Sequence, residues 1–167
     1  MANLWVLVTL LAGLQAPQPV ELGLAALVAQ APVIVRARVA DPRMDVQNLP
    51  VADGRGRPFQ RMRRHLDVVA TLRGHAPEHL RVDEPHWAAQ FAQWQQCQGD
   101  RSCQPAPQPR YRGQLSREPN PRQEVLVFLQ KNAKGEWELA AEFALETADR
   151  EAEVRALLQA ARQGGRR

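Results

Sequence analysis

The chain of 167 residues leaves room for one domain and a short segment at either end. Its hydrophobic share of 44% and charged share of 24% are those of a globular protein that buries a core. The 22 basic residues, nearly all arginine, outnumber the 18 acidic ones and give a formal net charge of +4. A surplus this small does not by itself indicate a nucleic-acid-binding protein.

Residues 1–16, "MANLWVLVTLLAGLQA", contain an apolar run from Leu4 to Leu14. The run is too short to span a bilayer, which takes about 20 residues, and its length suits a secretory signal peptide. No Lys or Arg precedes it, and Pro17 follows the best cleavage point, so a buried N-terminal strand or helix remains the alternative. We expect a signal peptide over 1–16, export to the periplasm or the extracellular space, and no stable membrane span.

The next two elements follow from periodicity. Apolar side chains at helical spacing predict a short helix that ends before Pro32; they are Leu24, Leu27, Val28 and Ala31. The segment 33–39 alternates apolar residues with Arg36 and Arg38, which predicts a half-buried strand. Prolines and glycines then predict a long loop over 41–58.

A second strand runs from about residue 61 to 72 and ends at Gly74. Its alternation is long, so we expect a bend or bulge within it. His65 and Asp67 share its polar face, either as an acid–base pair or, as we prefer, as part of a solvated face. Residues 79–82, "HLRV", predict a third strand.

Downstream, "EVLVFLQ" (124–130) is apolar on both faces, as a covered central strand would be. After a turn at 131–135, a fifth strand is expected over 136–146, with inward and outward residues alternating. The inward set is Trp137, Leu139, Ala141, Phe143 and Leu145, and the outward set is Glu136, Glu138 and Glu142. A final helix is expected over 149–162, with an apolar stripe made by Val154, Leu157, Leu158 and Ala161.

These elements predict a mainly β protein with flanking helices. Residues 17–167 would form a single five-stranded OB-like barrel with an N-terminal helix, a C-terminal helix and a long insertion, residues 84–123, between strands three and four.

The segments "APVIVRARV", "VVATLRG", "HLRV" and "VLVFL" resemble the OB-fold domains of tissue-inhibitor-of-metalloproteinase (netrin-like) type, as in exported bacterial proteins. The resemblance covers about residues 22–145. Animal inhibitors of this type chelate the protease zinc through an N-terminal cysteine, and this chain has no cysteine before Cys97. That mechanism is therefore not carried over, and protease inhibition by another edge remains only an alternative.

The insertion opens with "EPHWAAQFAQWQQ", a helix that Pro85 would begin and that carries Trp87, Phe91 and Trp94 on one stripe. The stripe either docks on the barrel, which we prefer, or binds a partner. Proline-rich residues follow, among which Tyr111 either anchors the segment, the default, or contacts a ligand.

Cys97 and Cys103 flank a Gly-Asp turn and are expected to form a disulfide in an oxidising compartment. A zinc site with His75, His79 or His86 is disfavoured, because the two-residue cysteine spacing of a zinc knuckle is missing.

No catalytic motif is found, since Ser102 and Ser116 lie outside any nucleophile-elbow pattern and no glycine-rich phosphate loop precedes a helix. We expect a monomeric, non-enzymatic binding or structural module without a cofactor or metal, whose partner is another protein. The candidate binding residues are Trp87, Phe91, Trp94, Tyr111, Arg61 and Arg63. The alternative, a domain for single-stranded nucleic acid, applies if residues 1–16 are not a signal, but the second strand offers few rings for base stacking.

Overall fold

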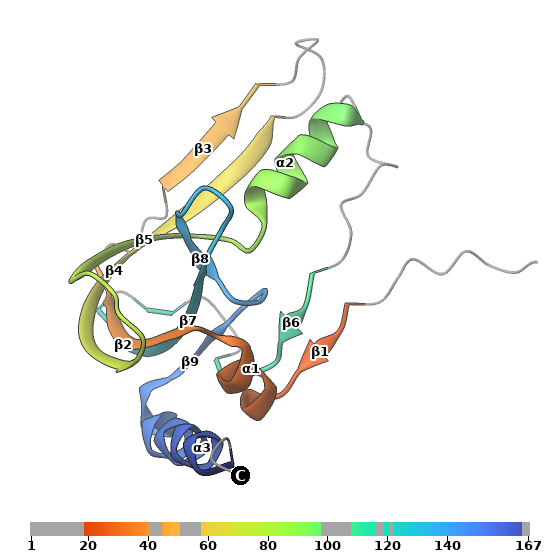
Figure 1. Ribbon diagram of the computed structural model, residues 1–167. Helices are drawn as coiled ribbons and strands as arrows, with labels where there is room; N and C mark the ends of the chain where they lie inside the picture. Colours follow the sequence, from red (N-terminus) through yellow and green to blue (C-terminus); the bar gives the residue numbers. More distant parts are fainter. Residues whose placement is uncertain are drawn as a thin grey trace, which may run out of the picture.

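The computed structural model describes residues 19–40, 45–50, 58–97, 108–115, 119–120 and 122–164 (Figure 1). The predicted signal peptide and Cys103 lie outside these ranges, so export and the disulfide stay predictions. The protein is mainly β, as the sequence predicts. Its elements in chain order are β1 (Glu21–Leu22), α1 (Leu24–Gln30), β2 (Val33–Val39), β3 (Asp45–Leu49), β4 (Phe59–Arg73), β5 (His79–Asp83), α2 (Trp87–Gln96), β6 (Arg110–Tyr111), β7 (Glu124–Lys131), β8 (Trp137–Leu139), β9 (Leu145–Thr147), a 3₁₀ turn (Ala148–Arg150) and α3 (Glu151–Gly164).

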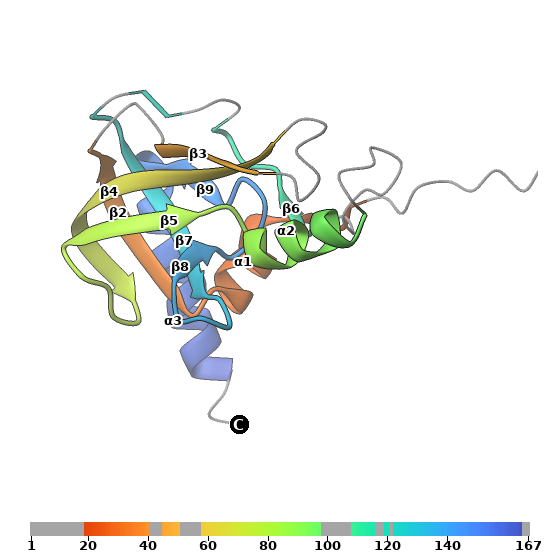
Figure 2. The same cartoon turned by 90° about the horizontal axis from the view of Figure 1, so that it is seen from above.

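Five strands are hydrogen-bonded in a ring. β2 lies between β4 and β7, β4 pairs with β5, β7 pairs with β8, and β8 returns to β5 (Figure 2). The order β7–β2–β4–β5 is that of a Greek key, in which the fourth strand returns to lie beside the first. All of these pairings are antiparallel except β5–β8, which is parallel and consists of one register pair, Asp83 with Glu138. This seam is where the ring closes.

The core lies inside the ring and beneath the terminal helices. β7 is buried from Val125 to Leu129. It is also paired on both edges, with β2 on one and β8 and β9 on the other, so it is a central strand. α1 buries Leu27 and Val28, and α3 buries Val154 and Leu158 where the two helices pack together. Ala161 is exposed, contrary to the predicted stripe, because α3 extends past the short α1 (Figure 2).

β4 contains the bulges that its length predicts. Its pairing with β2 passes from Ile34–Arg73 to Val35–Thr71, and again from Arg36–Ala70 to Ala37–Val68. Each step leaves one residue of β4 without a partner on β2, and such an extra residue bends a strand. β4 therefore curves around the ring, and its N-terminal residues extend beyond the part that pairs with β2.

The predicted loop over 41–58 is wrong in part, because residues 45–49 form β3, paired antiparallel with Phe59–Arg63 of β4. All of β3 is exposed except the half-buried Leu49, so it carries no apolar alternation to reveal it. Its pairing depends on the length of β4, which runs beyond the end of β2: β2 pairs with β4 only from Leu66 onward, and β3 takes the same edge at Phe59–Arg63. β3 and Phe59–Arg63 project from the ring in Figure 1, and we call them the β3–β4 arm.

The predicted fifth strand over 136–146 is also wrong as a continuous element. The chain advances from Leu139 to Leu145 while its partner on β7 changes only from Leu129 to Val127, so the residues between β8 and β9 loop out. Phe143 sits in this loop with a φ of 58° and is 50% exposed instead of inward. The Ala144 N–H donates to the Ala141 carbonyl at 3.1 Å, which closes the turn.

The described elements of the insertion, α2 and β6, are not among the five strands of the ring. α2 begins at Trp87, later than Pro85, with His86 as its N-cap, and it packs on β4. β6 pairs in parallel with β1, a short strand that the sequence pattern did not predict. No helix in the described parts of the chain is long and apolar enough to cross a membrane.

Candidate functional site

Five of the six predicted binding residues converge on the β3–β4 arm. Arg61 and Arg63 project from β4, and Trp87, Phe91 and Trp94 project from α2, which lies against the same part of β4. The sixth residue, Tyr111, lies elsewhere, in the core. The arm and α2 are therefore the candidate functional site.

The two arginines are held by carboxylates from β5 and from the turn before β8. Arg61 donates from Nε and Nη2 to the two oxygens of Asp83 at 3.0 and 2.5 Å, and from Nη2 to Glu136 at 3.2 Å. Arg63 donates to the same Asp83 oxygens at 3.1 and 3.3 Å. Asp83 is buried, so it needs this compensation. The network ties the arm to the ring.

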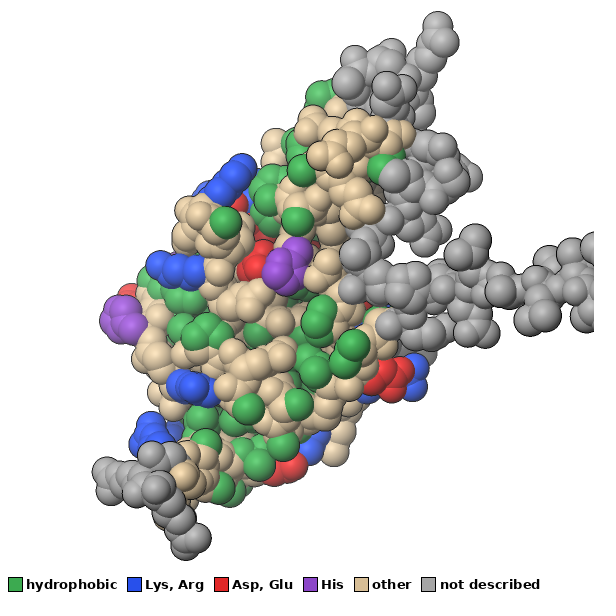
Figure 3. All heavy atoms as spheres, turned by 45° about the vertical axis from the view of Figure 1, so that its right-hand side comes forward, with side chains coloured by type: hydrophobic (Ala, Val, Ile, Leu, Met, Phe, Trp, Pro, Cys, Tyr) green, Lys and Arg blue, Asp and Glu red, His purple; other side chains and the backbone are tan. Residues whose placement is uncertain are grey.

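These contacts neutralise the charges of Arg61 and Arg63. Burial alone would lower the pKa of Arg61, but its hydrogen bonds and its attraction to Asp83 and Glu136 raise that pKa above its usual value. The hydrogen bond from Asn132, joined by that from Arg61, lowers the pKa of Glu136. On the described part of the face in Figure 3, basic and acidic side chains are interspersed and form no continuous basic stripe.

The aromatic stripe of α2 packs on the arm that projects from the ring, whereas the sequence-based preference is docking on the barrel itself. Trp87 is buried, and the guanidinium carbon of Arg61 lies 3.7 Å from the centre of its ring. Phe91 and Trp94 stack at 5.8 Å, and Phe59 of β4 contacts them at 5.5 and 5.7 Å between ring centres. The stripe is thus mainly an internal contact, which leaves the rest of the arm as the accessible surface.

The seam beside the arm buries a second carboxylate. Glu138, expected on the wet face of the fifth strand, is only 1% exposed, because β8 closes the ring against β5 at this residue. It accepts hydrogen bonds from the His86 backbone N–H at 2.9 Å and from Gln130 Nε2 at 2.8 Å. Glu138 is therefore a structural acceptor at the seam. Within the described ranges, no group of three metal-ligating side chains lies close enough together to hold a metal ion.

Tyr111 anchors the end of the insertion. Its hydroxyl donates to Glu146 at 2.5 Å, and both side chains are buried. Glu146 also accepts hydrogen bonds from the backbone N–H groups of Gln114 and Thr147 and from Arg150. Burial and the bond to Glu146 raise the pKa of Tyr111. Anchoring, the default interpretation, is what the structure shows.

His65 and Asp67 do not pair with each other. His65 Nε2 lies 2.6 Å from Asp45 Oδ2, and His79 Nδ1 lies 2.8 Å from Asp67 Oδ1. His65, Asp67 and His79 are among the residues that line a pocket of about 360 Å³. His65 and His79 are thus paired with two different carboxylates, and the acid–base pair of His65 with Asp67 that the sequence allowed is not formed.

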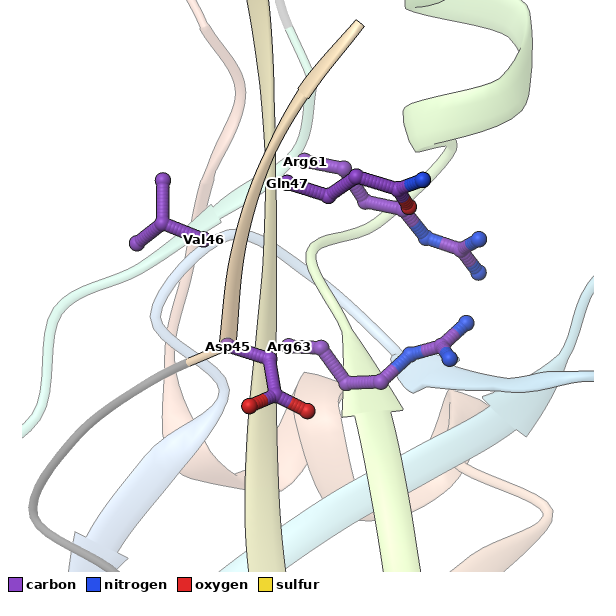
Figure 4. Close-up of a pocket in the computed structure, with 5 residues that line it drawn as sticks. All are labelled: Asp45, Val46, Gln47, Arg61 and Arg63. Carbon is purple, nitrogen blue, oxygen red and sulfur yellow. The ribbon is translucent and has the colours of Figure 1, made fainter.

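A second pocket, of about 440 Å³, lies on the β3–β4 arm and is lined by Asp45, Val46, Gln47, Arg61 and Arg63. Figure 4 shows Gln47 and the two arginines pointing to one side and Val46 to the other. Val46 is 51% exposed and Asp45 is 66% exposed at its side chain. Among the described strands, β3 pairs with β4 alone, so its other edge has no strand partner in this part of the chain; we call it the open edge.

The open edge of β3 is the feature that sequence reasoning missed. Its residues, "DVQNL", are mostly polar and carry no pattern that distinguishes a strand from a loop. The length of β4 was the one available signal. No protein-family model matches the sequence, and a search of curated proteins also finds no significant match.

Proposed function

We propose that this chain is an exported, non-enzymatic binding module that takes up an extended segment of a protein partner as an additional strand on β3. The observation that carries the proposal is the open outer edge of β3, whose backbone N–H and C=O groups have no strand partner within the described residues. Extended peptides bind such edges through main-chain hydrogen bonds, and alternate side chains supply specificity.

The position of β3 supports this mode of binding. The β3–β4 arm projects from the ring (Figure 1), and α2 packs on β4 through Phe59 and Arg61. α2 and the ion pairs to Asp83 stabilise the arm, so an incoming strand meets a preformed edge. Preformed edges lose less conformational entropy on binding than flexible ones.

We also propose that the ring of five strands is an OB-like barrel. Its Greek-key strand order, the bulged and strongly curved β4, and the parallel closure of β5 on β8 support this assignment. The fold alone would equally suit a domain for single-stranded nucleic acid. The pairing of Arg61 and Arg63 with carboxylates speaks against that function, since phosphate binding relies on available cations. Retention on single-stranded DNA that falls steeply with salt would reverse this preference.

Proline substitutions on β3 test the proposed strand addition. Successive N–H groups of a strand point to opposite edges, so of Val46→Pro and Gln47→Pro one removes a bond to β4 and the other an outward-facing donor. Thermal melting identifies the outward variant as the one that keeps its stability. Peptides that bind the unmodified full chain are first selected from a displayed library of extended peptides. The outward proline variant should bind these selected peptides about tenfold less tightly than the unmodified chain does.

Val69→Ser is the matched control, because Val69 is exposed on β4 away from the open edge. It should leave peptide binding unchanged. Selected peptides that bind the folded outward proline variant as tightly as the unmodified chain would rule out strand addition at β3.

Export is tested separately by the intact mass of the protein from its native host. Removal of residues 1–16 reports a cleaved signal peptide, and a further deficit of about 2 Da reports the bond between Cys97 and Cys103. A full-length mass with two free thiols contradicts export.

A further inference from the structure

The first two side chains of β3, Asp45 and Val46, point to opposite faces and differ in charge and polarity, and this difference specifies what an added strand would carry beside them. Asp45 and Gln47 share one face by alternation, and Val46 stands on the other (Figure 4). Asp45 is the single charged residue of β3 and is well exposed. Val46 is the exposed apolar residue of the strand.

The nearby cations lie farther from an added strand than Asp45 does. Neighbouring strands are about 4.8 Å apart, so an added strand would lie about 4.8 Å from β3 and about 10 Å from β4. Arg63, on β4, is already bound to Asp83, and Arg81 lies one strand farther away, on β5. The charge that an incoming side chain meets first is therefore the carboxylate of Asp45.

Asp45 has capacity for a further partner. Its Oδ2 is paired with His65, and its Oδ1 accepts no hydrogen bond from the described part of the chain. The hydrogen bond from His65 lowers the pKa of Asp45, with smaller contributions from the charges of His65, Arg81 and Arg63. The carboxylate is therefore ionised at neutral pH.

We propose that the segment taken up by β3 is basic and β-branched, with a lysine or arginine beside Asp45 and a valine- or isoleucine-like side chain beside Val46. This inference rests on the proposed strand addition and names the partner's chemistry. Opposite charges and β-branched pairs across neighbouring strands are the contacts that stabilise a sheet.

The test uses the full chain and three labelled peptides, titrated by fluorescence anisotropy. One peptide alternates valine with lysine, and the other two replace lysine with glutamine or glutamate. The lysine peptide should bind up to about fivefold more tightly than the glutamine peptide, and the glutamate peptide should bind most weakly. The chain's net charge of +4 would favour the glutamate peptide if binding were non-specific. A preference for lysine therefore reports the local site.

Variants of Asp45 assign the preference. Asp45→Asn should abolish the preference for the lysine peptide. Asp45→Lys should reverse the preference, so that the glutamate peptide binds more tightly than the lysine peptide. This binding of the glutamate peptide would also show that the Asp45→Lys variant is folded. Asp67→Asn is the matched control: Asp67 is 49% exposed and paired with a histidine in the same way, but it lies on β4. It should leave the preference intact.

Two failures are distinguishable. Equal affinity for the lysine and glutamate peptides, or an unchanged preference in Asp45→Lys, overturns the charge assignment and leaves strand addition standing. If none of the three peptides binds, or if binding is unaffected in the outward proline variant of β3, strand addition itself fails and the charge assignment fails with it.

Discussion

Arg61 places its guanidinium carbon 3.7 Å from the centre of the Trp87 ring while two of its nitrogens bind the buried carboxylate of Asp83. One side chain thus joins three parts of the molecule: the arm, the helix of the insertion and the seam of the ring. A cation stacked on an indole and paired with a buried acid contributes through both contacts.

We expect Arg61→Met to lower the free energy of unfolding by about 3 kcal/mol, because it leaves Asp83 with one arginine in place of two. Urea unfolding followed by far-UV circular dichroism measures the change. Arg112→Met is the control, since Arg112 forms a largely exposed ion pair with Glu21 and should matter by less than about 1 kcal/mol. If both variants lost the same free energy of unfolding, the buried ion pairs of Asp83 would contribute no more to stability than an exposed ion pair does.

Tyr111→Phe removes the hydroxyl that Glu146 accepts from, and the aromatic ring keeps its place in the core. The loss should be about 1–3 kcal/mol, because a buried carboxylate is left with one donor fewer. Urea unfolding again measures it. An unchanged unfolding midpoint would mean that water replaces the hydroxyl and that the bond does not anchor the insertion.

Glu146 makes the stability depend on pH in the acid range. Burial would raise its pKa, but hydrogen bonds from Tyr111, Thr147, Gln114 and Arg150 lower it below the ordinary value of 4.5. A depressed pKa in the folded state stabilises the fold above the unfolded pKa, and that contribution is lost as pH falls through the folded pKa.

Glu146→Gln should therefore reduce the loss of stability on acidification below about pH 4.5 relative to the unmodified chain. Urea midpoints across pH 3–7 measure the slopes. Parallel slopes for both proteins would contradict the depressed pKa.

Phe143→Gly should leave the protein as stable as before or more stable, by up to about 1 kcal/mol. A bulky residue at a φ of 58° is strained, and half of this ring is exposed. Its contact with Arg110, 5.3 Å from the ring centre, offsets part of that strain. Melting temperatures give the comparison.

Gly135→Ala serves as the counterpart, because Gly135 has a φ of 77° and free space where a Cβ would lie. It should destabilise by about 1 kcal/mol through backbone strain alone. A large loss in Phe143→Gly would show that the ring packs better than its exposure implies.

Local pattern was enough to predict the elements that bury a face. α1, β2, β5 and β7 lie where periodicity placed them, and the length of β4 predicted its bulges. An apolar stripe with a period of two or 3.6 residues indicates one buried face, as in β2 and α1, and a continuous apolar run indicates burial on both faces, as in β7.

Pairing between distant segments decided the rest. β3 can form because β4 extends past the end of β2 on the edge that the two strands share. Glu138 is buried because β8 closes on Asp83, and the break between β8 and β9 follows from the register that each keeps with β7. The candidate residues Arg61 and Trp87 were visible in the sequence, but their mutual contact was not. Strand register and ion pairing depend on residues far apart along the chain, so they cannot be predicted from local periodicity.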